Sequence, residues 1–156
     1  MPKPAGKPKT SDITSQVYVV AAEEHVTAAF KLLELREFVL AHYVAGLALE
    51  CIVRAYRTRM TRVFDERHDL YELARAAGFF SLFPPHRTES LSAAFGTVVA
   101  QWINTHRFRS EDSLRKFLTE RKLFSGIKGD LLYGRTRLIV NAAFDLVTLG
   151  VVEWES

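Results

Sequence analysis

The chain has 156 residues, of which 48% are hydrophobic and 25% charged, a composition that is typical of one soluble globular domain and excludes a largely disordered chain. A single cysteine, Cys51, excludes an internal disulfide framework and a cysteine-rich zinc site. The formal net charge of +3 comes from the N-terminus, because residues 1–10 hold three lysines and no acid and leave the rest of the chain formally neutral.

The N-terminus is predicted to be a flexible basic tail over residues 1–14, since it holds three of the five prolines. The remaining residues, 15–156, are predicted to form a single helical domain. No apolar run approaches the ~20 residues that cross a bilayer, and the N-terminus lacks the apolar stretch of a secretory signal. We therefore expect a cytoplasmic protein without membrane contact.

Residues from Asp12 to Met60 contain no proline, and their apolar residues recur at helical spacing. This stretch is long for one globular helix, so we expect two antiparallel helices that turn near Glu37–Ala41, the first capped by Thr14 or Ser15. The first helix is predicted to bury the stripe Val17, Val20, Ala21, Ala28, Leu32, Leu35 and Val39. The second is predicted to bury Val44, Leu47, Ala48, Cys51, Ile52, Ala55 and Tyr56.

A charged connector over residues 62–67 follows, and Asp65 or Asp69 is predicted to begin a short helix that ends at Gly78. The apolar segment over residues 79–85 is predicted to be a loop that packs on the core. Three further amphipathic stretches each follow a residue suited to cap a helix, namely Thr88, Ser110 and Asp130. The sequence therefore predicts an all-α fold, an up-and-down helical bundle of about five to six helices.

Several classes of enzyme site are missing from the sequence. The eight glycines never adopt the spacing of a phosphate-binding loop, and the five histidines never lie at the helical spacing of metal ligands. No G-x-S-x-G segment occurs, and Cys51 lies in an apolar stripe where a buried, inert thiol is expected. We therefore expect no metal and no cofactor.

The densest positive charge in the predicted domain lies over residues 54–67, where five arginines outnumber two acids. Arg54 and Arg57 share a helix face, and forked guanidinium groups suit phosphate oxygens. The first candidate site is therefore a phosphate site at Arg54 and Arg57. The alternative is a solvated face with ion pairs such as Glu50–Arg54.

Arg62 and His68, spaced R-x5-H, form a second candidate. A histidine that titrates near neutral pH moves protons, and an arginine stabilises a pentacoordinate phosphate. The pair thus suits metal-free cleavage of RNA by the neighbouring 2′-hydroxyl. The alternative is that His68 and Asp69 cap the following helix.

The segment from Trp102 to Arg109 is a third candidate, because it places an aromatic residue before a basic cluster at a helix end. Such residues stack bases and bind phosphates, with Arg107 as the predicted phosphate contact. The alternative is that Trp102 and Phe108 close the core while the cations face the helix C-terminus. We favour core packing for Trp102.

Together and in this order, these segments resemble the HEPN family (higher eukaryotes and prokaryotes nucleotide-binding). The segment over residues 41–55 is similar to the family's A-x-Y-x-A-G-x-A-x-E-x-x-x-[KR]-A helix. His68-Asp69-Leu70 is similar to its H-D-L segment, and Trp102 through Phe108 to its W-x4-R-[YF] feature. The resemblance covers about residues 17–150.

The resemblance implies an up-and-down helical bundle, often a homodimer, that binds a nucleotide or RNA and in many members partners a minimal nucleotidyltransferase in a toxin–antitoxin or defence pair. Catalytic members are metal-independent ribonucleases with an R-x4-6-H motif on a late helix. Here the last helix carries Asn141 in the place of that histidine, and no histidine follows His106.

We therefore expect a non-catalytic homodimeric domain that binds a nucleotide or RNA through Arg54, Arg57, His68 and Arg107. One alternative is a toxin-type ribonuclease that uses Arg62 and His68. The other is a pure protein-interaction module whose surface docks a nucleotidyltransferase.

Overall fold

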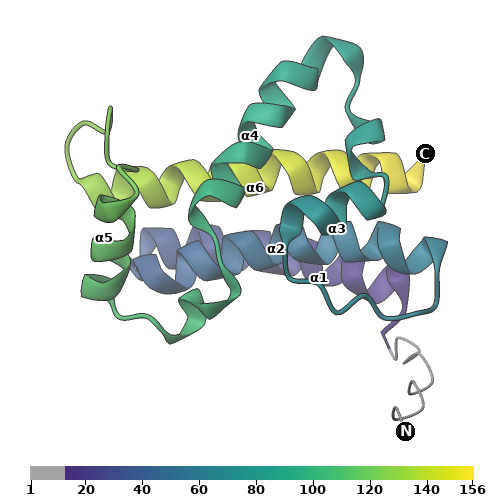
Figure 1. Cartoon of the computed structure of the whole chain (residues 1–156), viewed down its shortest axis with the longest axis horizontal. Coiled ribbons are helices and arrows are strands. Elements are labelled where there is room, and N and C mark those ends of the chain that lie inside the picture. The colour runs from purple at the N-terminus through teal and green to yellow at the C-terminus, as the bar shows by residue number, and fades with distance from the viewer. Residues whose placement is uncertain (1–12) are drawn as a thin grey trace, which may run out of the picture.

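The computed structural model describes residues 13–156 and confirms the all-α class (Figure 1). The α-helices of this range are α1 (Ser15–Glu34), α2 (Phe38–Met60), α3 (Leu70–Ala76), α4 (Thr88–Gln101), α5 (Glu111–Glu120) and α6 (Leu131–Glu155). Short 3-10 helices lie between them, namely η1 (Phe79–Leu82), η2 (Pro85–Arg87) and η3 (Asn104–Phe108). The predicted tail over residues 1–14 lies outside the described residues except at its last two positions.

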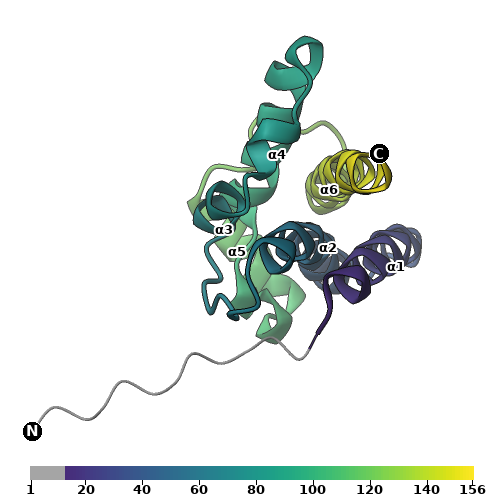
Figure 2. The same cartoon turned by 90° about the vertical axis from the view of Figure 1, so that its right-hand side faces the viewer.

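The three long helices α1, α2 and α6 run side by side along the longest axis of the molecule, and α4 packs across α6 (Figures 1 and 2). α1 and α2 are antiparallel, and α6 runs in the direction of α2. α2 is the central helix, because it contacts α1 and α6 along its length and α5 and α3 near its two ends. The two ends of α2 therefore position two different sets of side chains.

Four of the predicted helix starts are confirmed. In α1, α3, α5 and α6 a backbone N–H of the first turn donates to the predicted capping side chain, respectively Thr14, Asp69, Ser110 and Asp130. The prediction for Thr88 is wrong, because its hydroxyl donates to the carbonyl of Pro84 at 3.0 Å and Arg87 occupies the cap position. A threonine hydroxyl can bond the carbonyl four residues earlier instead of capping a helix.

The turns lie close to their predicted places. The first two helices are joined at residues 35–37, at the N-terminal edge of the predicted turn. Gly78 follows α3 with a φ of +67°, the left-handed conformation expected of a glycine at this position. The apolar segment after it forms η1, and Phe79 is fully buried, as predicted for a segment that packs on the core.

The buried face of α1 differs from the predicted stripe. Val17 and Val20 expose 52% and 47% of their surface, and Leu35 exposes 72%. The residues that α1 buries are instead Tyr18, Val19, Ala22, Val26, Ala29 and Leu33. Apolar residues line both sides of this helix, so helical spacing alone does not identify the side that packs on α2.

The small residues of α2 accommodate the indole of Trp102. A Cβ atom at Gly46 would lie 2.0 Å from Trp102 Cδ1, so the ring requires a glycine beneath it. The indole Nε1 donates to the carbonyl of Tyr43 at 2.9 Å, and the two rings stack with centroids 6.2 Å apart. The prediction that Trp102 packs in the core is confirmed, and two segments that carry the family resemblance meet here.

By length and composition, α2 alone among the described helices could cross a membrane. The mean hydropathy of its most apolar window is 1.6, although Glu50 and Arg54 interrupt any longer apolar run. Other parts of the protein bury 72% of that window, and the core helix of a bundle passes the same test.

Candidate functional site

Arg54 lies in the interior near the C-terminal end of α2, and its guanidinium donates hydrogen bonds to acceptors of the same chain. Nε and Nη2 donate to Glu50 Oε1 at 3.2 and 2.9 Å. Nη1 donates to the carbonyl of Asp65 at 2.7 Å, and Nη2 also donates to the carbonyl of Arg67 at 2.8 Å. Arg54 therefore ties the connector between α2 and α3 to the core, and its donors already have acceptors.

Asp65 forms ion pairs with two further arginines. Its carboxylate accepts from Arg57 Nε at 3.2 Å and from Arg67 Nε at 2.8 Å. The Arg67 guanidinium holds the pKa of the Asp65 carboxyl well below its usual range. Arg54, Arg57 and Arg67 with Glu50 and Asp65 form what we name the carboxylate-paired cluster. Two of the predicted ligand contacts, Arg54 and Arg57, thus lie where carboxylates compensate their charge.

His68 reaches the carboxylate-paired cluster from the surface. Its Nδ1 lies 3.2 Å from Glu50 Oε1, while 57% of the side chain is exposed. Asp69 caps α3, so the alternative role predicted for this segment is confirmed for Asp69. Arg62 is exposed, and across the described part of the chain no hydrogen bond or ion pair joins it to His68.

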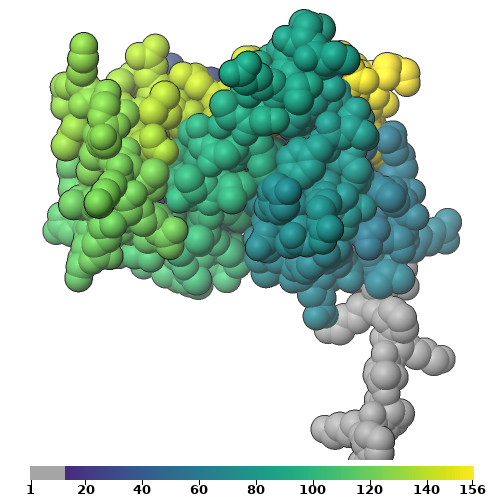
Figure 3. Space-filling model, turned by 45° about the horizontal axis from the view of Figure 1, so that its top comes forward, coloured from purple at the N-terminus to yellow at the C-terminus, as the bar shows by residue number. Residues whose placement is uncertain are grey.

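The elements η3, α5 and the start of α6 meet at the opposite end of the long axis (Figures 1 and 3), and the sequence of these elements contains a second group of arginines. Residues 101–137 hold nine basic and four acidic side chains, an excess that the neutral total outside residues 1–10 conceals. Five arginines of this segment form no ion pair with any carboxylate of residues 13–156. We name them the basic end: Arg107, Arg109, Arg121, Arg135 and Arg137.

Neutral acceptors hold Arg109 in place. Its Nε donates to His106 Nδ1 at 3.1 Å, and its Nη1 donates to Ser113 Oγ at 2.9 Å. His106 is fully buried, and its Nε2 donates to the carbonyl of Gln101 at 2.6 Å, which leaves Nδ1 as the acceptor. Burial lowers the pKa of His106, so the ring is neutral near pH 7. Arg109 is therefore fixed without being neutralised.

Uncharged groups also position Arg121 and Arg135. The guanidinium carbon of Arg121 lies 4.3 Å from the ring centroid of Phe117, and that of Arg109 lies 4.8 Å from the same centroid. Arg135 Nε donates to Gln101 Oε1 at 2.9 Å. Because the backbone carbonyl of Gln101 also accepts from η3, this one residue links α4, η3 and α6 in a polar network.

Arg107 and Phe108 form the exposed edge of the basic end. Phe108 exposes 76% of its surface, and the guanidinium carbon of Arg107 lies 4.7 Å from its ring centroid. The alternative in which Phe108 closes the core is therefore wrong. Arg107 lies at this edge as a surface cation, well separated along the chain from the other predicted ligand contacts.

His42 lies next to this network and is fully buried on α2. Its ring packs edge to face on His106 with centroids 5.8 Å apart, and neither of its nitrogens has a hydrogen-bond partner among the described residues. Burial is the main reason that the pKa of His42 falls to about 3, and the nearby Arg135 guanidinium lowers it further. A neutral histidine thus lies in the interior at the end of the molecule where the arginines are uncompensated.

Sequence analysis named Arg107 of the basic end as a phosphate contact and included Arg109 in the same candidate segment, but it did not identify Arg121, Arg135 or Arg137. Arg109, Arg121 and Arg135 lie on or beside three different elements, so no motif spacing connects them. The signal that could have found them is the local charge, since bases outnumber acids over residues 101–137 while the whole domain is neutral. The neutral acceptors of Arg109 lie three and four residues away in the sequence, whereas the acceptor of Arg135 is Gln101, 34 residues away, and follows only from the tertiary structure.

The structure offers little support for a nucleophilic or metal site. Cys51 is buried, and burial raises the pKa of its thiol to about 12, which agrees with the predicted inert thiol. Over residues 13–156 no three metal-ligating side chains gather as a metal site. The basic end is therefore the candidate functional site.

No family model matches this chain, and neither a curated protein nor a solved structure matches it. The resemblance to the HEPN family stays a prediction, and the function has to be argued from the geometry of the site.

Proposed function

We propose that this protein binds RNA through the basic end and does not cleave it. The observation that carries the proposal is the way in which Arg109 and Arg135 are held, because neutral acceptors fix both guanidinium groups and leave their charge uncompensated. A cation that is already ordered binds a phosphate without breaking an ion pair and with little loss of side-chain freedom. The carboxylate-paired cluster lacks this property.

Phe108 favours RNA over a small inorganic anion. An exposed aromatic ring beside cations gives an unpaired base a surface on which to stack, and such stacking contributes about 1–3 kcal/mol per base. Single-stranded RNA presents both unstacked bases and consecutive phosphates. A mononucleotide could use Phe108 and one arginine, whereas a strand can use Arg107, Arg109, Arg121 and Arg135 together.

One contact favours the ribonuclease as a second candidate function. Glu50 Oε1 lies 3.2 Å from His68 Nδ1, and a carboxylate in this position orients an imidazole and leaves its Nε2 free to act as a base. Cleavage also needs a group that stabilises the pentacoordinate phosphate. Arg62, the predicted partner, is not joined to His68 by any hydrogen bond or ion pair of the described residues, so binding is the better-supported function.

The test measures the affinity for a fluorescein-labelled single-stranded RNA by anisotropy at several salt concentrations. Arg109→Gln is expected to raise Kd about tenfold and to reduce the slope of log Kd against log salt by about 0.7, the value for one phosphate contact on a single strand. Arg62→Gln is the matched control, because Arg62 is an exposed arginine outside the basic end. It is expected to bind like the wild type.

Three outcomes of this experiment would change the conclusion. Equal affinity of the wild type and an Arg109→Gln/Arg121→Gln variant would exclude the basic end as the RNA-binding site. A loss of affinity confined to Arg62→Gln would place the binding site at the connector. The same mixtures, incubated with a chelator and resolved on a denaturing gel, are expected to contain intact RNA. Cleavage that His68→Ala abolishes would establish the ribonuclease instead.

A further inference from the structure

The solvent-facing side of α1 is apolar at both ends and charged in the middle. Its members are spaced by three or four residues and so lie on one side of the helix; they form what we name the outer α1 face: Val17, Val20, Glu24, Ala28, Lys31 and Leu35. Except for Ala28, which is half-buried, all are exposed. Four of the six belong to the stripe that the sequence predicted to be buried, so the apolar pattern exists, but none of residues 13–156 covers it.

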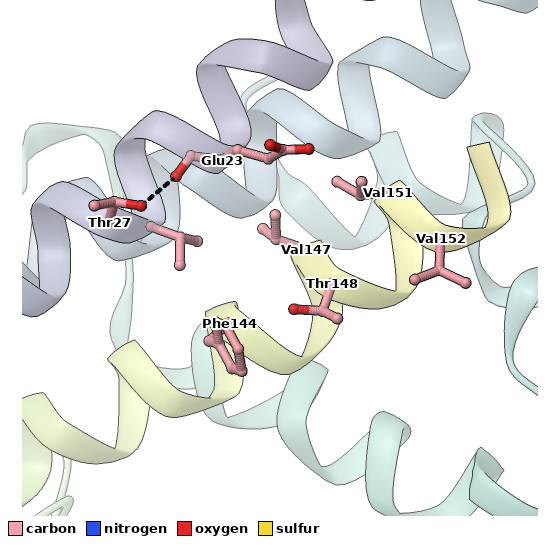
Figure 4. Close-up of a pocket in the computed structure, with 8 residues that line it drawn as sticks. Glu23, Thr27, Phe144, Val147, Thr148, Val151 and Val152 are labelled. Atoms are coloured by element: carbon pink, nitrogen blue, oxygen red, sulfur yellow. Dashed lines mark hydrogen bonds between the residues drawn. The ribbon is translucent and has the colours of Figure 1, made fainter. Parts of the chain in front are cut away.

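A groove between α1 and α6 continues this apolar surface. It holds about 270 Å³ and is lined on the α1 side by Glu23, Val26 and Thr27 (Figure 4). On the α6 side, Phe144 and Val152 expose 45% and 58% of their surface. In this view Val147 and Val151 point from α6 toward α1, and Phe144, Thr148 and Val152 lie on the near face of α6, so the apolar surface extends over two helices.

We infer that a second copy of this chain covers the outer α1 face, with the two α1 helices antiparallel. Glu24 and Lys31 form no ion pair with any described residue of their own chain, and they lie seven residues apart on the same side of α1. A two-fold axis between Thr27 and Ala28 places Glu24 opposite the partner's Lys31. The symmetry makes this pair twice.

The same register matches the apolar residues. It places Val20 opposite the partner's Leu35, again twice, so that apolar side chains meet apolar ones on both sides of the paired charges. A parallel arrangement would put Glu24 opposite Glu24 of the partner subunit, and like charges in such positions destabilise an interface. The face is thus complementary to itself in one orientation, which is the requirement for a symmetric dimer and favours a second copy over an unrelated helix.

The extent of the surface also suits a dimer. A 20-residue helix is about 30 Å long, and a stable interface covers about 800 Å² on each partner, which a helix with an adjoining groove can supply. The inference is independent of the proposed function. The groove and α1 lie outside the basic end, and a protein that failed to bind RNA could still form this dimer.

The test is sedimentation equilibrium of charge-reversed variants of the full chain. The wild type is expected to be a dimer, whereas Glu24→Lys and Lys31→Glu each bring like charges together twice and are expected to weaken the dimer at least tenfold. The variant with both reversals restores opposite charges across the interface and is expected to recover dimerisation. Lys116→Glu and Glu120→Lys on α5 carry the same changes of net charge elsewhere and are expected to leave the dimer unchanged.

The design separates the possible results. A wild type that stays monomeric at 100 μM, or a dimer that none of the α1 variants weakens, would overturn the inference. Loss of the dimer in both single variants without recovery in the double variant would overturn the register. Far-ultraviolet circular dichroism checks that every variant is folded, and all the substituted side chains are exposed, so their replacement leaves the core intact.

Discussion

Two groups of arginines lie at opposite ends of the molecule, and they differ in the acceptors that hold them. In the carboxylate-paired cluster, Glu50 and Asp65 bind Arg54, Arg57 and Arg67. At the basic end, a histidine nitrogen, a serine hydroxyl and a glutamine oxygen take the place of carboxylates. Both groups look alike in the sequence, so the density of arginine does not distinguish a structural cluster from a binding surface.

The difference has a simple electrostatic consequence. A carboxylate compensates the charge of the arginine that it holds, and in the interior this pair must remain intact because an unpaired buried charge is costly. A neutral acceptor fixes the guanidinium through one hydrogen bond. It does not compensate the positive charge, so the guanidinium still attracts an anion. The first arrangement stabilises the connector after α2, and the second leaves fixed cations whose charge no carboxylate among residues 13–156 compensates.

Removal of the buried carboxylate is the largest expected effect. Glu50→Gln leaves the Arg54 guanidinium in the interior without a compensating charge, and we expect a loss of about 3–5 kcal/mol in the free energy of unfolding. Urea denaturation followed by circular dichroism measures it. Glu23 is an exposed glutamate of α1 that forms no ion pair with residues 13–156, so Glu23→Gln is the control and is expected to change stability by less than about 0.5 kcal/mol.

A small loss for Glu50→Gln, similar to that of its control, would contradict the structural role of this cluster. Arg54 would then be free to leave its internal acceptors, and the two groups of arginines would no longer differ. RNA affinity supplies a second readout, because a variant that stays folded is expected to bind RNA as the wild type does.

The histidines of the other end predict how stability depends on pH. The pKa of folded His42 is about 3, against 6.5 in the unfolded chain, so between these values the unfolded state binds a proton that the folded state does not. The stability of the wild type therefore falls as the pH is lowered below 6.5, by about 1.4 kcal/mol for each pH unit from this residue alone. His42→Leu removes this contribution and also removes two buried nitrogens without partners.

The measurement is the difference in unfolding free energy between His42→Leu and the wild type from pH 7 to pH 5. The variant is expected to be at least as stable as the wild type at pH 7, and the difference in unfolding free energy in its favour is expected to increase as the pH is lowered. His86→Leu, at an exposed histidine in η2, is expected to show no such divergence. Parallel curves for His42→Leu and wild type would show that His42 is not buried as a neutral ring.

The features of the fold that depend on local chemistry could be predicted from the sequence. Thr14, Asp69, Ser110 and Asp130 begin their helices because a side-chain oxygen satisfies a first-turn N–H within a few residues, and that geometry needs no tertiary partner. The all-α class follows in the same way from spacing summed over long segments. The prediction that Trp102 packs in the core is confirmed, as is expected of a large aromatic side chain, but its place over Gly46 follows only from the fold.

What the sequence could not supply depends on which surfaces meet. Val17 and Val20 are as apolar as the residues that α1 buries, and only the positions of α2 and α6 determine that they face outward. The Glu50–Arg54 ion pair was predicted as the alternative for its segment and is confirmed, but only the fold shows that it is buried and that Gln101 holds Arg135 from 34 residues away. The predicted ligand contacts therefore divide between the two ends of the molecule: Arg54 and Arg57 lie in the carboxylate-paired cluster, and Arg107 lies at the basic end.

The variant with the smallest expected effect on stability tests the comparison most directly, because it replaces a neutral acceptor of the basic end with a carboxylate. Ser113→Asp puts a carboxylate where a hydroxyl now accepts from Arg109 Nη1 at 2.9 Å. The residue lies in the first turn of α5, where a negative charge is favourable, so stability is expected to change by no more than about 0.5 kcal/mol. RNA affinity is nevertheless expected to fall about tenfold, since the new carboxylate compensates the charge of Arg109. Ser113→Asn has a similar shape without the charge and is the matched control, expected to bind within about twofold of the wild type. Equal losses of RNA affinity in both variants would mean that the position of Arg109 matters and its charge does not. No loss of affinity in either variant would mean that Arg109 does not contact RNA.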